Sequence, residues 1–307
     1  MRRLLQMSLR HHVLVAILAV VTFCTLALTQ TAQIGRASSG DRATAAVESA
    51  PRSLERSFWS DALVRDMPYE VYLPPGYYSD PDRRYPVLYM LHGLGGDYRS
   101  WQADGLFSQA TAMIEAGEIE SMIIVTPNGE RGYWVDHANN GPRFGSYIAK
   151  DLVSTIDAEY RTITTREARA IGGMSMGGHG ALQLALNNPG EFGIVGAHSV
   201  ALRRFGQAFD FFGDRQYFEA HDPVSICLKN PVQASKFQIW LDIGDKDAWY
   251  PAAKLFHEQL QSYGVPHQWN VSSGDHNDAY WTAHSADYLR FYSNAFGKSS
   301  SALLTAA

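Results

Sequence analysis

In the segment AIGGMSMGGHGAL, residues 170–182, one serine stands between two pairs of glycines, Gly172-Gly173 and Gly177-Gly178. Ser175 has the spacing Gly-x-Ser-x-Gly with Gly173 and Gly177. This spacing is typical of a sharp turn between a strand and a helix, where larger side chains at the two flanking positions would collide with neighbouring backbone. The turn exposes the hydroxyl above the first N–H groups of the helix, which stabilise negative charge. Ser175 is therefore a candidate nucleophile, although a tight turn that needs glycines only for packing would show the same pattern.

A serine hydroxyl attacks a carbonyl only when a base takes its proton and an acid orients that base. In hydrolases with this turn, the chain order is serine, then acid, then histidine. The segment WLDIGDKDAW follows Ser175 and supplies Asp242, Asp245 and Asp247. Farther on, the segment SSGDHNDAYW places His276 in a loop before the last expected helix. The spacing favours His276 as the base and leaves Asp245 and Asp247, in one turn after a strand, as the candidate acids.

A glycine-rich segment, LHGLGGDYRSW at residues 91–101, follows an early apolar run. Glycines there let backbone N–H groups face a reacting carbonyl oxygen. In this type of hydrolase the oxyanion is held by the N–H after the nucleophile and by one from this early loop. The corresponding residues are Met176 and Leu94. A simple connecting turn would also contain glycines, but four such segments in the expected order favour the catalytic interpretation.

These segments need strands and helices that bring them together. Apolar runs that predict strands occupy residues 69–74, 85–93, 121–129, 167–175, 193–200 and 237–244. Amphipathic stretches that predict helices occupy residues 105–117, 146–160, 177–188, 251–263 and 279–296. Continuous apolar runs alternating with helices indicate an α/β fold with a mostly parallel, twisted sheet and helices on both faces. Function in such sheets collects at the carboxyl ends of the strands.

The N-terminal segment differs from the rest of the chain. Residues 1–29 contain three arginines and no acid, and residues 13–28 form an uncharged apolar run, which is typical of a signal peptide or an N-terminal membrane anchor. Residues 30–53 have linker composition. We expect a catalytic domain over residues 54–298 and a disordered tail over residues 299–307. An exported location follows (secreted, periplasmic or in the cell envelope), with membrane contact only through an uncleaved anchor.

The composition of the chain argues against several classes of partner and cofactor. The 307 residues carry a formal charge of −5, which becomes −8 if the N-terminal arginines are removed, and no basic stripe suggests nucleic-acid binding. Neither His-Glu-x-x-His nor paired cysteines occur, so no metal or other cofactor is expected. Cys24 lies in the apolar run, which leaves Cys227 without a disulfide partner after cleavage. The oligomeric state stays open.

The segments YPVLYMLHGLGG, AIGGMSMGGHGALQLAL, GDKD and GDHNDAYW resemble the esterase D, antigen 85 and feruloyl esterase branch of the α/β hydrolases over residues 54–297. The resemblance implies an α/β-hydrolase fold and a serine carboxylesterase that works through an acyl-enzyme. It selects Asp247 as the acid, because Gly244 begins a Gly-x-x-Asp pattern, and it supports His276 and Leu94 in their roles. Two alternatives remain: an acyltransferase that uses a sugar or alcohol acceptor, and a non-catalytic binding protein.

Two aromatic segments are candidates for the substrate pocket. Residues 131–147 follow an expected strand, and residues 201–223 lie where this fold commonly carries a small cap insertion. The proposed substrate contacts are Tyr133, Trp134, Phe209, Phe212 and Trp281. Cap aromatics that only join the cap to the body are an equal alternative. The expected substrate is a small-molecule or carbohydrate-linked ester.

Overall fold

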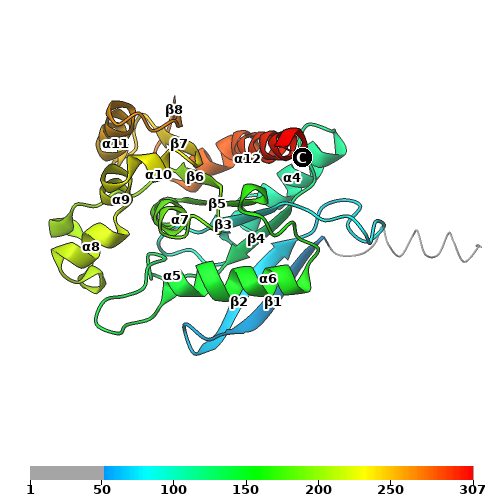
Figure 1. Ribbon diagram of the computed structural model, residues 1–307, viewed down its shortest axis with the longest axis horizontal. Coiled ribbons are helices and arrows are strands. Elements are labelled where there is room, and N and C mark those ends of the chain that lie inside the picture. The colour runs from blue at the N-terminus through cyan, green and yellow to red at the C-terminus, as the bar shows by residue number, and fades with distance from the viewer. Residues whose placement is uncertain (1–51, 307) are drawn as a thin grey trace, which may run out of the picture. The chain divides into compact units, whose positions relative to one another are not determined.

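The computed structural model describes residues 52–306, with side chains described through residue 298. The described chain forms an eight-stranded sheet with the order β1-β2-β4-β3-β5-β6-β7-β8. The strands are β1 (Ser53–Ser60), β2 (Arg65–Tyr72), β3 (Val87–Leu91), β4 (Ile123–Pro127), β5 (Arg169–Met174), β6 (Ile194–His198), β7 (Gln238–Gly244) and β8 (Gln268–Ser272). Strands β1 and β2 pair antiparallel, as do β2 and β4, whereas every pair from β4 to β8 is parallel (Figure 1).

Helices cover both faces of this sheet because successive strand residues point to opposite faces. On one face Val87, Tyr89 and Leu91 of β3 share a core with residues of α6, α7 and α11. On the other face Leu88 and Met90 share a core with α3, α4 and α12. The helices are α3 (Ser100–Ala103), α4 (Leu106–Glu115), α5 (Phe144–Ser146), α6 (Val153–Glu159), α7 (Met176–Asn187), α8 (Arg215–His221), α9 (Pro223–Lys229), α10 (Pro231–Ala234), α11 (Tyr250–Ser262) and α12 (Asp278–Ala306).

The predicted α/β-hydrolase architecture is confirmed, and each expected strand and helix has a counterpart in the described residues. Three local features differ from expectation. The stretch expected as one helix over residues 146–160 begins as a π-helix, Tyr147–Leu152, before α6. The strand β1 adds an antiparallel edge whose side chains are all exposed or half-buried except that of Ser60, which is why no continuous apolar run marks it.

The C-terminal end is the third difference. Helix α12 continues to Ala306, whereas a disordered tail was expected over residues 299–307. After Gly297 no further glycine or proline interrupts the chain, and Ala302, Leu303 and Leu304 are good helix formers.

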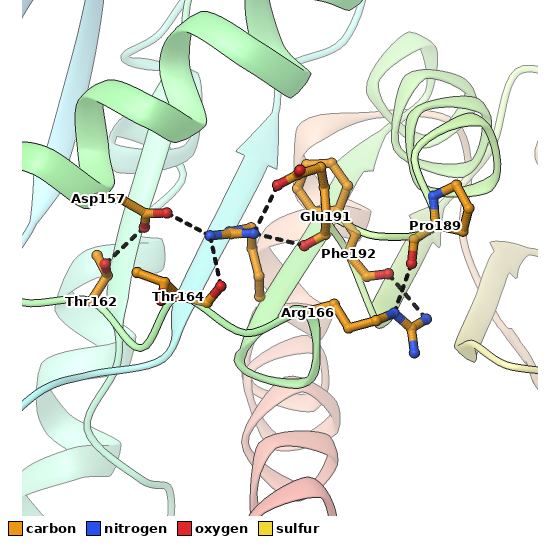
Figure 2. A network of polar contacts seen from close by, with 8 residues as sticks. Asp157, Thr162, Thr164, Arg166, Pro189, Glu191 and Phe192 are labelled. Carbon is orange, nitrogen blue, oxygen red and sulfur yellow. Dashed lines mark hydrogen bonds and ion pairs between the residues drawn. The ribbon is translucent and has the colours of Figure 1, made fainter.

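Strand β5, which carries the candidate nucleophile at its end, is anchored at its start. Figure 2 shows the polar network there. The guanidinium of Arg169, 3% exposed, donates to Asp157 Oδ2 at 2.6 Å and to the Glu191 carboxylate and carbonyl at 3.0 Å each. Arg166 donates from Nε to the Pro189 carbonyl at 2.8 Å. These bonds join the start of β5 to α6 and to the loop after α7, so the strand is fixed before its functional end.

The insertion between β6 and β7 corresponds to the expected cap. It contains two short 3-10 turns, Phe205–Gln207 and Asp210–Phe212, followed by α8, α9 and α10. Asp222 caps the N-terminus of α9 by accepting from the Ser225 N–H at 2.9 Å. The free thiol of Cys227 in α9 is fully buried.

The described residues do not include the predicted signal peptide or anchor (residues 1–29) or most of the predicted linker (residues 30–53). Strand β1 begins at Ser53, the last residue of that predicted linker. Among the described residues, no helix combines the length and apolar character that crossing a bilayer requires.

Candidate active site

The turn at Ser175 has the strained backbone that its glycines predict. Ser175 lies between β5 and α7 with φ 56° and ψ −113°, and it is 8% exposed. A Cβ atom at Gly173 would lie 2.6 Å from the Gly177 carbonyl carbon, and one at Gly177 would lie 2.2 Å from the Leu91 carbonyl oxygen. Backbone atoms cannot move aside as a flexible side chain does, so both positions require glycine.

Three side chains from separate loops form one hydrogen-bonded series. His276 Nε2 lies 2.8 Å from Ser175 Oγ, and His276 Nδ1 lies 2.7 Å from Asp247 Oδ2. A carboxylate can only accept, so Nδ1 carries the proton and the free Nε2 accepts from the serine hydroxyl. The Asp247 side chain is fully buried, and its Oδ1 accepts from the Trp249 N–H at 2.8 Å. This arrangement leaves the imidazole ready to take the serine proton.

Asp245, two residues before Asp247, has a different position. Its exposed carboxylate accepts from the Gly274 N–H at 3.0 Å. Two backbone bonds run beside this contact, from the Asp245 N–H to the Ser272 carbonyl at 2.8 Å and from the Lys246 N–H to the Gly274 carbonyl at 3.0 Å. Asp245 therefore joins the loop after β7 to the loop that carries His276, and it makes no bond to the imidazole.

Asp242, the first acid of the cluster, lies in a buried network behind the site. Its Oδ1 lies 2.6 Å from His198 Nδ1 and accepts from the Trp240 indole at 2.8 Å. Its Oδ2 accepts from the hydroxyls of Tyr280 and Tyr288 at 3.2 and 2.9 Å. The Tyr280 ring also packs against Gly274, where a Cβ would lie 2.6 Å from it. Through Tyr280, the network thus supports the loop that carries His276, called the histidine loop below.

His198 belongs to the same buried network, and the sequence carries no local signal for it. Its Nε2 lies 2.9 Å from the Tyr292 hydroxyl, and the side chain is fully buried. No local pattern links a histidine at the end of β6 to a tyrosine in α12, because only the packing of the helix on the sheet brings the two together.

The two predicted oxyanion donors are the backbone N–H groups of Met176, which directly follows Ser175, and of Leu94, which lines the same hollow as Ser175. The Met176 N–H is the first of α7, and the four first N–H groups of a helix have no intrahelical partner. Leu94 lies in the loop after β3 and is 37% exposed. Neither backbone N–H has a hydrogen-bond partner among the described residues. The oxyanion role of these two N–H groups therefore stays a prediction.

His92 holds the glycine-rich loop in place. Its Nδ1 donates to the Gly93 carbonyl at 2.8 Å, and its Nε2 accepts from the Gly129 N–H at 2.9 Å. Burial lowers the pKa of His92, so the ring is neutral, as these two bonds require. A histidine that precedes the glycines was present in the sequence segment, but its contact with Gly129 depends on the neighbouring strand β4.

A hollow of about 600 Å³ opens over Ser175 and His276. One wall comes from the loop after β3 and from α3 with the turn that follows it, and the other from the histidine loop and the start of α12. The lining residues are Gly93, Leu94, Gly95, Gly96, Ser100, Ala103, Asp104, Met174, Ser175, His276, Asn277, Asp278 and Trp281. An ester of moderate size can reach the serine hydroxyl from this side.

Of the five predicted substrate contacts, Trp281 lines this hollow, and its ring meets that of His276 almost at right angles, with centroids 5.2 Å apart. The other four do not line it. Tyr133, Trp134 and Phe212 are at most 1% exposed, and Phe209 stacks on Phe211 in the cap.

The prediction for these four aromatics is corrected by their packing. The Trp134 indole fills the space beside Gly129 and Gly180, where added Cβ atoms would lie 2.3 and 2.5 Å from it. Tyr133 packs against Phe209 and Phe212 and accepts a hydrogen bond from Arg203 Nε at 2.9 Å. These four aromatics therefore fit the alternative interpretation, in which they join the cap to the body of the domain.

The described residues contain no group of three or more His, Cys, Asp or Glu side chains arranged to hold a metal ion. His179, at the start of α7, is fully buried between aromatic rings, and burial lowers its pKa to about 3. This histidine is neutral and lies in the core of the cap junction, apart from the series formed by Asp247, His276 and Ser175.

The family model named Esterase, with the description "Putative esterase", matches residues 60–292. The chain belongs to the Esterase family. Its resemblance to esterases, noted from sequence segments, is thereby confirmed.

Individual relatives agree with the family. Esterase Rv1288 of Mycobacterium tuberculosis is 29% identical over 265 residues, which cover 75% of this chain and 56% of that protein. The chain thus spans little more than half the length of this relative. S-formylglutathione hydrolase of Bos taurus is 26% identical over 78% of this chain and 93% of its own length. The solved structure of a ferulic acid esterase has a TM-score of 0.73 and 25% identity, covering 79% of this chain and 98% of its own. These likenesses agree with membership of the Esterase family and with an α/β-hydrolase fold.

Proposed function

We propose that this protein is an exported serine carboxylesterase that hydrolyses carboxylic esters through an acyl-enzyme. One observation carries the proposal: the continuous series of hydrogen bonds from Asp247 through His276 to Ser175, at the floor of an open hollow. The same order of groups, positioned by unrelated folds, is the known arrangement for activating a serine hydroxyl.

In the first half of the reaction, Ser175 Oγ bonds to the ester carbonyl carbon while its proton passes to His276 Nε2. The carbonyl oxygen becomes an oxyanion, which the N–H groups of Leu94 and Met176 accommodate. The C–O bond to the alcohol then breaks, and the alcohol leaves with the proton from His276. Asp247 fixes the imidazole tautomer and stabilises the imidazolium in between.

In the second half, water attacks the acyl-enzyme, and His276 takes its proton and returns one to Ser175 Oγ as the acid leaves. Oxyanion donors of this kind are worth about 10²–10³ in kcat each. The N–H of Met176 suits the role because it also lies at the positive end of the α7 dipole.

The proposed substrates are small-molecule or carbohydrate-linked carboxylic esters. The support is the family together with similar proteins named acetyl esterase, feruloyl esterase and S-formylglutathione hydrolase. Export is proposed from the arginines and the apolar run of residues 1–29.

The test combines labelling and turnover. Purified protein is treated with a fluorescent fluorophosphonate and assayed on p-nitrophenyl esters of graded acyl length, beside feruloyl and acetyl-xylan substrates. We expect labelling and ester hydrolysis, both abolished in Ser175→Ala. Ser262→Ala, which alters a surface serine in α11, is the matched control and should retain both. Folded protein that neither labels nor hydrolyses any ester would contradict the proposal. If an added alcohol or sugar receives the acyl group in preference to water, the protein is an acyltransferase, the first alternative.

A further inference from the structure

The hollow over Ser175 carries negative charge on both walls. Among the residues that line it, the side chains with an acidic or basic charge at neutral pH are Asp104 and Asp278, and no lysine or arginine is present. Asp104 follows α3 on one wall, and Asp278 begins α12 on the other. Two carboxylates therefore face the space in which the ester must lie.

Neither carboxylate is neutralised by the protein. Among the described residues, the side chains of Asp104 and Asp278 have no hydrogen-bond or ion-pair partner. Asp104 is partly buried, and the loss of water around it, with a smaller contribution from the nearby charge of Asp278, raises its pKa to about 6. A carboxylate that is poorly hydrated, unpaired and beside a like charge is stabilised when a cation approaches.

A second feature of the same walls also suits a polar, cationic ligand. Trp281 lines the hollow next to His276, and its indole ring adds an aromatic surface near Asp278. An aromatic wall near carboxylates is the composition with which proteins bind ammonium groups. No competing positive charge from the described lining residues would repel such a group.

We propose that Asp104 and Asp278 set the charge preference of the active site, so that esters bearing a fixed positive charge near the carbonyl are hydrolysed in preference to neutral esters of the same shape, and anionic esters are disfavoured. This inference rests on the proposed esterase function and adds two specificity-determining residues to it. Neither residue takes part in bond making or breaking. The ammonium group belongs either to the alcohol or to the acyl portion of the ester, and the assay distinguishes the two.

The test uses two matched pairs of esters. Butyrylcholine and 3,3-dimethylbutyl butyrate differ in charge on the alcohol side and hardly in shape. The methyl ester of 4-(trimethylammonio)butanoate and methyl 5,5-dimethylhexanoate do the same on the acyl side. For at least one pair we expect kcat/KM of the cationic ester to exceed that of the neutral one by about tenfold, the lower range of electrostatic effects in charged clefts. The ratio should shrink in about 1 M salt, where the screening length is about 3 Å.

The variants are Asp104→Asn, Asp278→Asn and the double change, with Asp66→Asn in β2 as a control that removes one exposed acidic charge outside the hollow. We expect each single variant to lower the cationic-to-neutral ratio and the double variant to bring it within about twofold of one, whereas Asp66→Asn should keep the wild-type ratio. Because both esters of a pair are assayed on the same preparation, partial unfolding cancels in the ratio. If Asp104→Asn does not fold, Asp278→Asn still tests the idea, since that side chain is exposed.

A second measurement reports on the unpaired charge itself. Because the pKa of Asp104 is higher in the folded protein than the ordinary value of 3.8, its ionised form lowers stability above about pH 6, and this cost disappears as the pH falls towards 4. Asp104→Asn should therefore raise Tm at pH 8 relative to wild type, and the difference should shrink at pH 4.5.

The outcomes separate the two proposals. The charge preference would be overturned by equal kcat/KM for cationic and neutral esters in both pairs, or by a ratio that the double variant leaves unchanged. Hydrolysis of the neutral esters would still support the esterase function in either case. Absence of hydrolysis for all four esters and for p-nitrophenyl esters would instead contradict the proposed function.

Discussion

Replacing Asp247 and Asp245 one at a time by asparagine separates the acid that serves catalysis from the acid that holds a loop. Asp247→Asn keeps the size of the side chain but removes the negative charge 2.7 Å from His276 Nδ1. The amide also offers an N–H to the imidazole, which favours the tautomer that cannot accept the serine proton. The loss of the corresponding acid in a serine protease lowers kcat by about 10⁴, or about 5.4 kcal/mol of activation free energy. We expect a loss of this size.

Asp245→Asn should behave differently. The amide oxygen of asparagine can still accept from the Gly274 N–H, the bond that Asp245 makes at 3.0 Å. The side chain is exposed, and an exposed charge contributes only about 0–1 kcal/mol. The two parallel backbone bonds between the loops stay in place. We therefore expect kcat within about tenfold of wild type, about 1.4 kcal/mol or less.

The assay is kcat on a p-nitrophenyl ester at saturation, measured in parallel on both variants, with Tm and circular dichroism to confirm folding. The ratio of the two kcat values should be about 10³ or more. A nearly inactive Asp245→Asn beside an active Asp247→Asn would refute the assignment and show that the hydrogen bond between Asp247 and His276 does not serve the reaction.

Three further predictions concern the backbone of the turn, the anchor of β5 and a buried histidine. Gly177→Ala should lower kcat/KM by more than about 100-fold, since the methyl group would lie 2.2 Å from the Leu91 carbonyl oxygen and push Ser175 out of position; wild-type activity in the variant would show that the turn adapts. Arg169→Leu should lower the unfolding free energy by about 2–4 kcal/mol in chemical denaturation, because Asp157 and Glu191 lose their buried partner; an unchanged value would mean that solvent replaces the guanidinium without cost. Burial holds the pKa of His179 far below its unfolded value near 6.5, so the folded protein loses stability as the pH falls from about 6.5 towards 3, where the unfolded chain binds the proton first. His179→Leu should reduce the fall in Tm between pH 7 and pH 4.5, and an identical fall would assign the pH dependence to other groups.

The sequence by itself determined the parts of the site that depend on local chain geometry. A strand-to-helix turn around Ser175 needs glycine at fixed offsets, because the colliding atoms belong to the turn and to the adjacent strand. Buried parallel strands must be apolar on both faces, so their positions could be read as continuous runs. The loops with Leu94 and His276 follow such strands directly. Chain order and loop position therefore predicted which residues would meet at one edge of the sheet.

The tertiary structure decided what depends on contacts between distant segments. Asp245 and Asp247 share one turn, and their difference arises from the loop 29 residues farther along, which meets one carboxylate with an imidazole and the other with a backbone N–H.

Aromatic residues have the same composition whether they line a pocket or fill a core, so only packing places Trp134 beside Gly129 and Gly180 and Trp281 at the hollow. Likewise Asp104 and Asp278 lie far apart in the chain, and their shared hollow exists because α3 and α12 pack on the same face of the sheet. Side-chain environment is a property of three-dimensional neighbours, which local residue pattern does not specify.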